Sequence, residues 1–153
     1  MLGLPVAAGV VVLVAGTLAT QLLVWRLLIG PRLGARNADA EREATIALGG
    51  EILHSGTVRF LGLQSGGRAQ IRGTGHLAVG RDEVVFVLLA PRRTVRISRA
   101  AITGVDTPRT HLGRSVLRPL LRIAFTADDG RPDAVAFDVG RSLAAWQETL
   151  TVG

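Results

Sequence analysis

The chain opens with a long apolar run. Residues 2–24 carry no charged side chain, and Gln21 is their only strongly polar member. Because a helix rises about 1.5 Å per residue, about 20 such residues cross the hydrocarbon core of a bilayer. Trp25 and Arg26 follow, where an aromatic ring and a cation are expected at the membrane interface. The pattern predicts a transmembrane helix over residues 2–29.

A cleaved signal peptide is the alternative interpretation of this run, because small residues occur at Ala15 and Gly16. Against it, the run lacks a positive n-region, exceeds the usual apolar core of about 7 to 15 residues, and precedes no small-x-small cleavage site. Positive charges follow the run instead, at Arg26, Arg32 and Arg36. The positive-inside rule therefore predicts a plasma-membrane protein with its N-terminus outside and its C-terminal domain in the cytoplasm.

Residues 30–45 are polar, mixed in charge and punctuated at their start by Gly30 and Pro31, which are expected to end the preceding helix. This composition favours a juxtamembrane linker with a short helix around residues 38–44. Arg32 and Arg36 could contact lipid headgroups, but three acidic residues close by offset their charge. A spacer is the favoured interpretation.

From residue 46 onward, short stretches of alternating apolar and polar residues are separated by glycine-rich turns, which is typical of an antiparallel β domain. The most apolar stretch, residues 82–89, is followed by a Pro-Arg-Arg turn and a return over residues 94–98. An Asp-Asp-Gly sequence at residues 128–130 predicts another hairpin. The remaining strands are expected at residues 52–61, 69–79 with a bulge at 73–75, 120–126 and 133–139.

After Gly140 the apolar residues change to a helical period. Ser142 is a candidate N-cap for a helix that ends near Thr151, and Leu143, Trp146 and Leu150 fall on one face of it. The chain is therefore expected to contain six or seven strands and one closing amphipathic helix.

Several of these segments together resemble the pleckstrin-homology (PH)-like superfamily, particularly its bacterial PH and GRAM-type members. Residues 75–79 and the apolar strand at 82–88 are similar to one conserved block of that family. Residues 94–98 leading into 101–105 are similar to the next one. The Asp-Gly hairpin and a last helix that carries Trp146 complete the resemblance.

The resemblance implies a mainly β fold in which about seven antiparallel strands form a split barrel, capped by the C-terminal helix. The expected organisation is a transmembrane helix at 2–29, a linker at 30–45 and a PH-like domain at 46–153. Members of the family bind lipid headgroups, peptides or proteins, or hold oligomers together, and they are not enzymes. The loop at 62–67, which is basic in phosphoinositide-binding members, carries no charge here, so no specific inositol phosphate site is implied.

Composition adds one candidate site. All 18 basic residues are arginine, and twelve of them lie with only three acids between residues 59 and 122, a net charge of +9. Such a region can attract anionic lipid, although a solvated face that keeps the domain soluble is an equally simple interpretation. The candidate residues for binding an anionic surface are Arg92, Arg93, Arg96, Arg99, Arg109, Arg114 and Arg118.

Other chemistries find little support in the sequence. The chain has no cysteine, which excludes disulfides, thiolate zinc sites and a cysteine nucleophile. The three histidines lack metal-site spacing, and only six aromatic residues of the Phe, Trp and Tyr type are present, which disfavours nucleic acid as a partner. No metal, cofactor or nucleic acid is expected.

The expected function is therefore that of a single-pass membrane protein with a PH-like binding and adaptor domain. Its partner is either a protein or anionic lipid of the inner leaflet. The alternative is a structural protein that self-associates into a homo-oligomer and has no ligand. An enzyme is the third interpretation, and the sequence offers no convergent acid and base pair for it.

Overall fold

A computed structural model describes residues 30–151, and the side chains of residues 34–151. The predicted transmembrane helix, Trp25 and Arg26 therefore lie outside the described residues. The chain divides into two units, residues 1–36 and residues 37–153, and the sheet belongs to the second. Among residues 30–151, no helix is long and apolar enough to span a bilayer.

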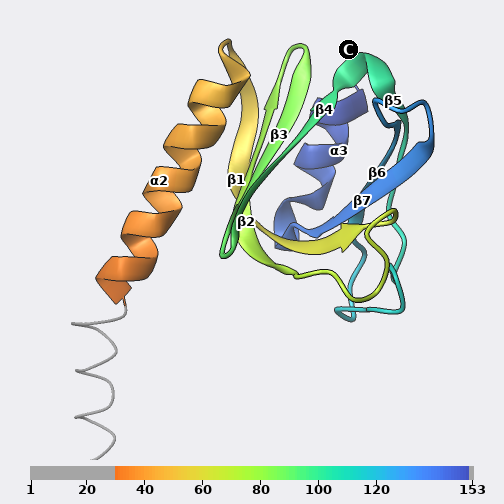
Figure 1. Cartoon of the computed structure of the whole chain (residues 1–153), viewed down its shortest axis with the longest axis horizontal. Coiled ribbons are helices and arrows are strands. Elements are labelled where there is room, and N and C mark those ends of the chain that lie inside the picture. The colour runs from red at the N-terminus through yellow and green to blue at the C-terminus, as the bar shows by residue number, and fades with distance from the viewer. Residues whose placement is uncertain (1–29, 152–153) are drawn as a thin grey trace, which may run out of the picture. The chain divides into compact units, whose positions relative to one another are not determined.

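Seven antiparallel strands form one sheet in the order β4-β3-β2-β1-β7-β6-β5 (Figure 1). A C-terminal helix, α3 (Leu143–Thr151), follows the last strand. The prediction of a mainly β domain with seven antiparallel strands and a C-terminal helix is confirmed. The strands are β1 Ile52–Leu63, β2 Gly73–Gly80, β3 Glu83–Leu89, β4 Arg92–Ser98, β5 Ile102–Asp106, β6 Leu121–Thr126 and β7 Pro132–Asp138, with short 3-10 helices η2 Arg99–Ala101 and η3 Gly140–Ser142.

The long strand β1 belongs to both halves of the sheet. It pairs with β2 through residues 52–60 and with β7 through residues 59–63, and a register shift after Phe60 bends it between the two. Phe60, Phe86 and Phe137 meet in the core between the halves, with ring centroids 5.0 to 6.0 Å apart. Such offset and tilted rings are favoured arrangements for aromatic pairs.

Helix α3 lies between the two halves of the sheet (Figure 1) and buries Trp146 and Leu150 against the core. Leu143 packs beside them, as the helical spacing predicts. Ser142 acts differently from the predicted N-cap: its hydroxyl donates to Val139 O at 2.8 Å and accepts from Trp146 Nε1 at 3.2 Å. This link fixes the indole at the start of the helix.

The apolar residues that alternate with polar ones in the predicted strands face the core. Phe60 is buried beside exposed Arg59, and Ile97 is buried beside exposed Arg96. Successive side chains of a strand point to opposite faces of the sheet, so the alternation of apolar and polar residues in the sequence predicts which of them are buried. The same agreement holds for Val58, Leu121, Ile123, Phe125, Val135, Phe137 and Val139, while Val95 is partly buried against this core.

Helix α2 (Gly30–Leu48) occupies the stretch predicted to be a linker with a short helix. Within the second unit, Ala40 and Ala44 are fully buried and pack with Ala78, Val85 and Val87 on the outer face of β2 and β3. Residues four apart lie on one helix face, and two small side chains let the helix approach the sheet closely. β3 is thereby buried on both faces, which explains its continuous apolar sequence.

The predicted bulge at residues 73–75 is wrong. These residues pair with β1 in regular register, and the register shift of this pair lies at the other end, near Ile52. Residues 69–72 precede β2 and are not strand. Gly75 has a steric role instead, because a Cβ at this position would lie well inside van der Waals contact with the ring of Phe86 and the carbonyl of Val87.

Two further details of the prediction change. Residues 102–106, which lie in none of the predicted strands, form β5 and pair with β6. The turn between β3 and β4 is shorter than predicted, since Arg92 and Arg93 already pair with Leu89 and Leu88. Both arginines therefore belong to a strand.

A Gly75→Ala substitution should destabilise the domain by about 1–3 kcal/mol, because the added methyl group must displace a packed ring or the backbone of β3. The free energy of unfolding in urea measures the effect. Gly104→Ala is the matched control, because nothing lies within 4 Å of the position its Cβ would take. Equal stability of the two variants would contradict the steric role of Gly75.

Candidate anionic-surface site

Two of the three predicted arginines on β4, Arg92 and Arg96, are bound to helix α2 or to β3. Glu43 accepts hydrogen bonds from Arg92 Nε and from the hydroxyl of Thr94, both at 2.7 Å. These two hydrogen bonds lower the pKa of the Glu43 carboxyl below its usual value. Arg96 donates to Glu83 at 2.7 Å and to the carbonyl of Ala47 at 2.8 Å. Arg92 and Arg96 therefore hold α2 along β4.

Arg99 joins three elements. Its guanidinium donates to the carbonyl of Gly80 at 3.2 Å and to the carbonyls of Thr149 and Leu150 at 3.0 and 3.5 Å. The last two carbonyls belong to the C-terminal turn of α3, where a cation also complements the helix dipole. The arrangement assigns Arg99 a structural role.

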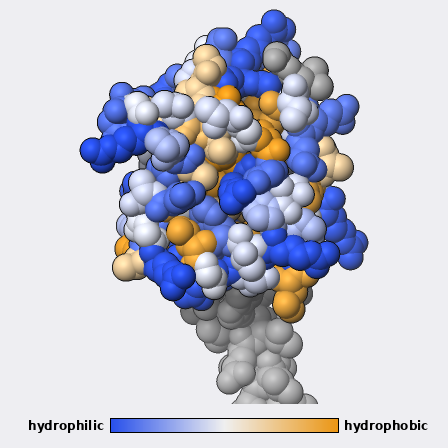
Figure 2. Space-filling view, turned by 90° about the vertical axis from the view of Figure 1, so that its right-hand side faces the viewer, coloured by the Kyte–Doolittle hydropathy of each residue, from blue (hydrophilic) through white to orange (hydrophobic). Residues whose placement is uncertain are grey.

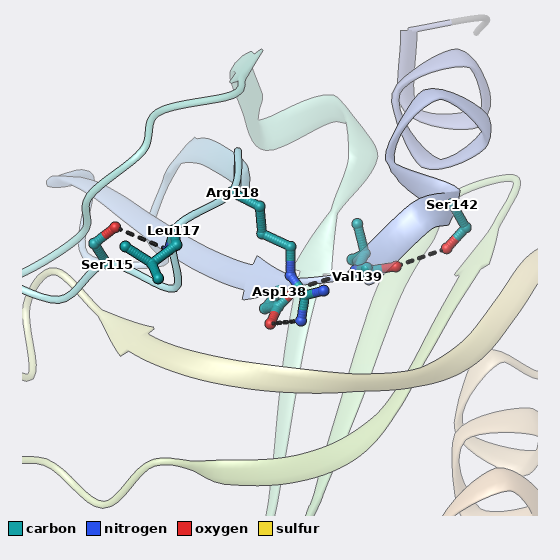
Figure 3. A network of polar contacts seen from close by, with 7 residues as sticks. Ser115, Leu117, Arg118, Asp138, Val139 and Ser142 are labelled. Carbon is teal, nitrogen blue, oxygen red and sulfur yellow. Dashed lines mark hydrogen bonds and ion pairs between the residues drawn. The ribbon is translucent and has the colours of Figure 1, made fainter.

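Arg118 is paired with Asp138 (Figure 3). Its Nε and Nη2 donate to the two carboxylate oxygens, each at 2.8 Å, and Gly140 N donates to Oδ1 at 3.1 Å. Burial acts to raise the pKa of Asp138, but the hydrogen bonds from Arg118 and Gly140 outweigh it, and the pKa lies below its usual value. This pair ties the β5–β6 loop, residues 107–120, to the end of β7.

Other contacts hold the same loop against β1. His111 is buried, and its Nε2 donates to the carbonyl of Gly62 at 3.0 Å. Burial lowers the pKa of His111, so the neutral ring is favoured at this position. Leu120 is fully buried with Leu61 and Ala136. The loop is therefore anchored at both its middle and its end.

Three of the seven predicted arginines, Arg93, Arg109 and Arg114, are exposed and have no acidic partner within the described part of the chain. Arg93 lies on β4 in alternation with Arg92 and Thr94, on the face opposite α2. Arg109 and Arg114 both belong to the β5–β6 loop, a different element from the β4 arginines.

A further arginine that has no acidic partner among residues 34–151 lies in a different loop. Arg68, in the β1–β2 loop, places its guanidinium carbon 3.6 Å from the position that a Cβ on Gly113 would take. Arg68 therefore lies beside Gly113, the residue that directly precedes Arg114. We call Arg68, Arg109 and Arg114 the arginine surface.

Arg68 is absent from the predicted site residues because 45 residues separate it from Gly113 and no local sequence pattern links the two loops. The contact between His111 and Gly62 brings them together. Within residues 30–151, no group of three or more His, Asp or Glu side chains is placed to hold a metal ion. The chemistry that the arginine surface can perform is attraction and hydrogen bonding of anions.

Replacing Arg118 by Gln should lower the stability of the domain at neutral pH, because Asp138 would keep its charge in a buried position without its main partner. A carboxyl whose folded pKa is depressed contributes stability above its unfolded pKa and loses it as the pH falls through the folded value. The difference between wild type and variant should thus narrow below about pH 4. Urea unfolding across this pH range measures it, and a difference that is independent of pH would contradict the role of the pair.

Comparison of the chain with protein-family models and with curated proteins gives no match. The fold and the arginine surface are therefore the features from which a function can be proposed.

Proposed function

We propose that this chain is a single-pass membrane protein whose PH-like domain docks on the anionic inner leaflet and acts there as an adaptor. The order of the seven strands and the helix that closes the core support a PH-like split barrel. The apolar run at residues 2–24 and the arginines after it support an anchor with its N-terminus outside. The proposal places the domain in the cytoplasm, at the plasma membrane.

The observation that carries the proposal is the arginine surface. Its three guanidinium groups have no acidic partner among the described residues, whereas each of the arginines Arg92, Arg96 and Arg118 has one. An uncompensated arginine near an anionic membrane contributes about 1 kcal/mol of attraction. The anchored β5–β6 loop presents two of these groups without a large ordering cost.

The path of the chain also favours docking through the β1–β2 loop, which carries Arg68. Glu43 contacts Arg92, and Ala47 contacts Arg96, so α2 runs along β4 away from the β3–β4 turn. The chain therefore enters the second unit at the end that carries this turn. The start of β2 lies there too, since a Cβ on Gly73 would be 3.8 Å from the carbonyl of Ala90. The β1–β2 loop, with Arg68, leads directly into it.

Peptide capture along a sheet edge receives less support. The edge strand β5 has only five residues and a register shift after Ile102, and the edge strand β4 carries three arginines. Short, bulged or charged edges disfavour pairing with another strand. Self-association through the outer face of β2 and β3 is disfavoured as well, because Ala40 and Ala44 cover that face.

Residues 31–153 should bind vesicles containing anionic lipid and not neutral ones. The double variant Arg68→Gln, Arg114→Gln should bind about thirtyfold more weakly, because two contributions of about 1 kcal/mol are lost. Co-sedimentation with vesicles of each composition measures the affinity. Circular dichroism verifies that each protein is folded.

The matched control is Arg81→Gln, Arg131→Gln. It loses the same formal charge, but its arginines already face Glu51 and Asp129. A similar loss in both double variants would show an effect of net charge alone and would contradict the arginine surface. Equal recovery of the protein with neutral and with anionic vesicles would contradict the binding of anionic lipid. Light scattering that shows an oligomer at all protein concentrations would favour the alternative of a structural homo-oligomer.

The orientation gives a separate prediction. A reporter enzyme that is active only outside the membrane should stay inactive when fused after Gly153, because the arginines that follow the apolar run retain the domain in the cytoplasm. Fusion of a reporter that is active only in the cytoplasm is the control. Activity of the first reporter together with inactivity of the second would show that the C-terminal domain lies outside and would contradict the proposed topology.

A further inference from the structure

Large apolar side chains are exposed at four positions in the described part of the chain. They are Ile46, Leu53, Ile71 and Leu117, and Leu117 is the most exposed at 94%. Ile71 and Leu117 lie in the same two loops that carry Arg68 and Arg114. The right-hand side of the domain in Figure 1 faces the viewer in Figure 2, where small apolar areas interrupt a largely hydrophilic surface.

The backbone conformation of Leu117 is unfavourable in free energy. Its φ is 64°, in the left-handed region that residues with a side chain rarely adopt. The Oγ of Ser115 accepts a hydrogen bond from Leu117 N at 3.2 Å, and Arg118 is fixed to Asp138 directly afterwards (Figure 3). Such strain persists where neighbouring contacts over-determine the conformation, and it is concentrated at functional positions.

The surroundings of Leu117 indicate what it contacts. Arg114 lies three residues before it, and the half-exposed guanidinium of Arg118 follows it. The hot spot of a protein–protein interface is centred on Trp, Tyr or Arg within a broad, well-packed patch. A protruding aliphatic side chain surrounded by cations is instead suited to the interface of an anionic bilayer. Arginine heads can remain with the phosphates while an aliphatic tip enters the acyl boundary.

We propose that Leu117, assisted by Ile71, inserts into the interfacial region of an anionic bilayer while the arginine surface binds the lipid phosphates. This inference depends on the proposed docking of the domain and specifies its mode. Electrostatic attraction brings the loops to the membrane, and the burial of the aliphatic side chains retains them there.

The absence of cysteine makes a direct test available, because a single introduced cysteine is unique in the chain. The full chain with Leu117→Cys is reconstituted in vesicles and labelled with a membrane-impermeant, polarity-sensitive maleimide dye. Only molecules whose domain faces outward then carry the dye. We expect a blue-shifted emission that doxyl-labelled lipids quench in anionic vesicles, and a solvent-like emission in neutral vesicles.

Leu53→Cys is the matched control, since Leu53 is an exposed aliphatic residue on β1, outside the two loops. Its dye should report water in both kinds of vesicle. A dye at Ile71→Cys should show the same response as one at Leu117, and this response should decrease when Leu117 is also changed to Ser. Retention of the full response in that double variant would contradict the cooperation of the two residues.

Three outcomes would overturn the inference. A dye at Leu117 that reports water in anionic vesicles excludes insertion, and the vesicle affinity of the arginine variants then decides separately whether electrostatic docking stands. An emission shift that is equal in neutral and anionic vesicles excludes a role for electrostatic attraction by the arginine surface. A blue shift that depends on protein density and escapes lipid quenching would assign Leu117 to a contact with a second copy.

Discussion

The burial of β3 on both of its faces is the constraint on which the second unit depends. Phe86 points into the aromatic core, while Val85 and Val87 pack beneath α2. Removing either cover would expose a continuous apolar strand to water, at about 25 cal/mol for each Å² of apolar surface. Helix α2 is therefore part of the folded domain from Asn37 onward, and its two buried alanines cover the face of β3 that lies opposite the phenylalanines of the core.

Arginine connects the elements that this packing leaves at the surface. Arg92 and Arg96 hold α2, Arg99 joins the β2–β3 turn to the end of α3, and Arg118 holds the β5–β6 loop. The planar fork of the guanidinium lets one side chain bind a carboxylate or several carbonyls at once. Most arginines of the basic region thus stabilise the domain, and the proposed binding surface consists of three of the remaining ones.

The parts of the fold that could be predicted from sequence are those with a local physical signature. The alternation at Leu121, Ile123 and Phe125 marks a strand with one buried face, and the Asp-Asp-Gly turn marks its hairpin. Gly75 is predicted from sequence to lie in a bulge, and only the position of Phe86 shows that a lack of space for a side chain requires glycine there. The helix over residues 30–48 was underestimated because alanines among charged residues give a weak apolar period.

The neighbouring positions of Arg68 and Arg114 have a consequence for how the proposed docking would respond to its medium. Cations in two adjoining loops, without an acidic partner among the described residues, raise the local potential, and mobile anions screen that potential over a Debye length of about 8 Å at physiological ionic strength. Attraction through these groups would weaken steeply as salt is added, whereas burial of an aliphatic side chain would not. Ionic strength can therefore separate the reversible, charge-dependent approach of the domain from its retention at the membrane.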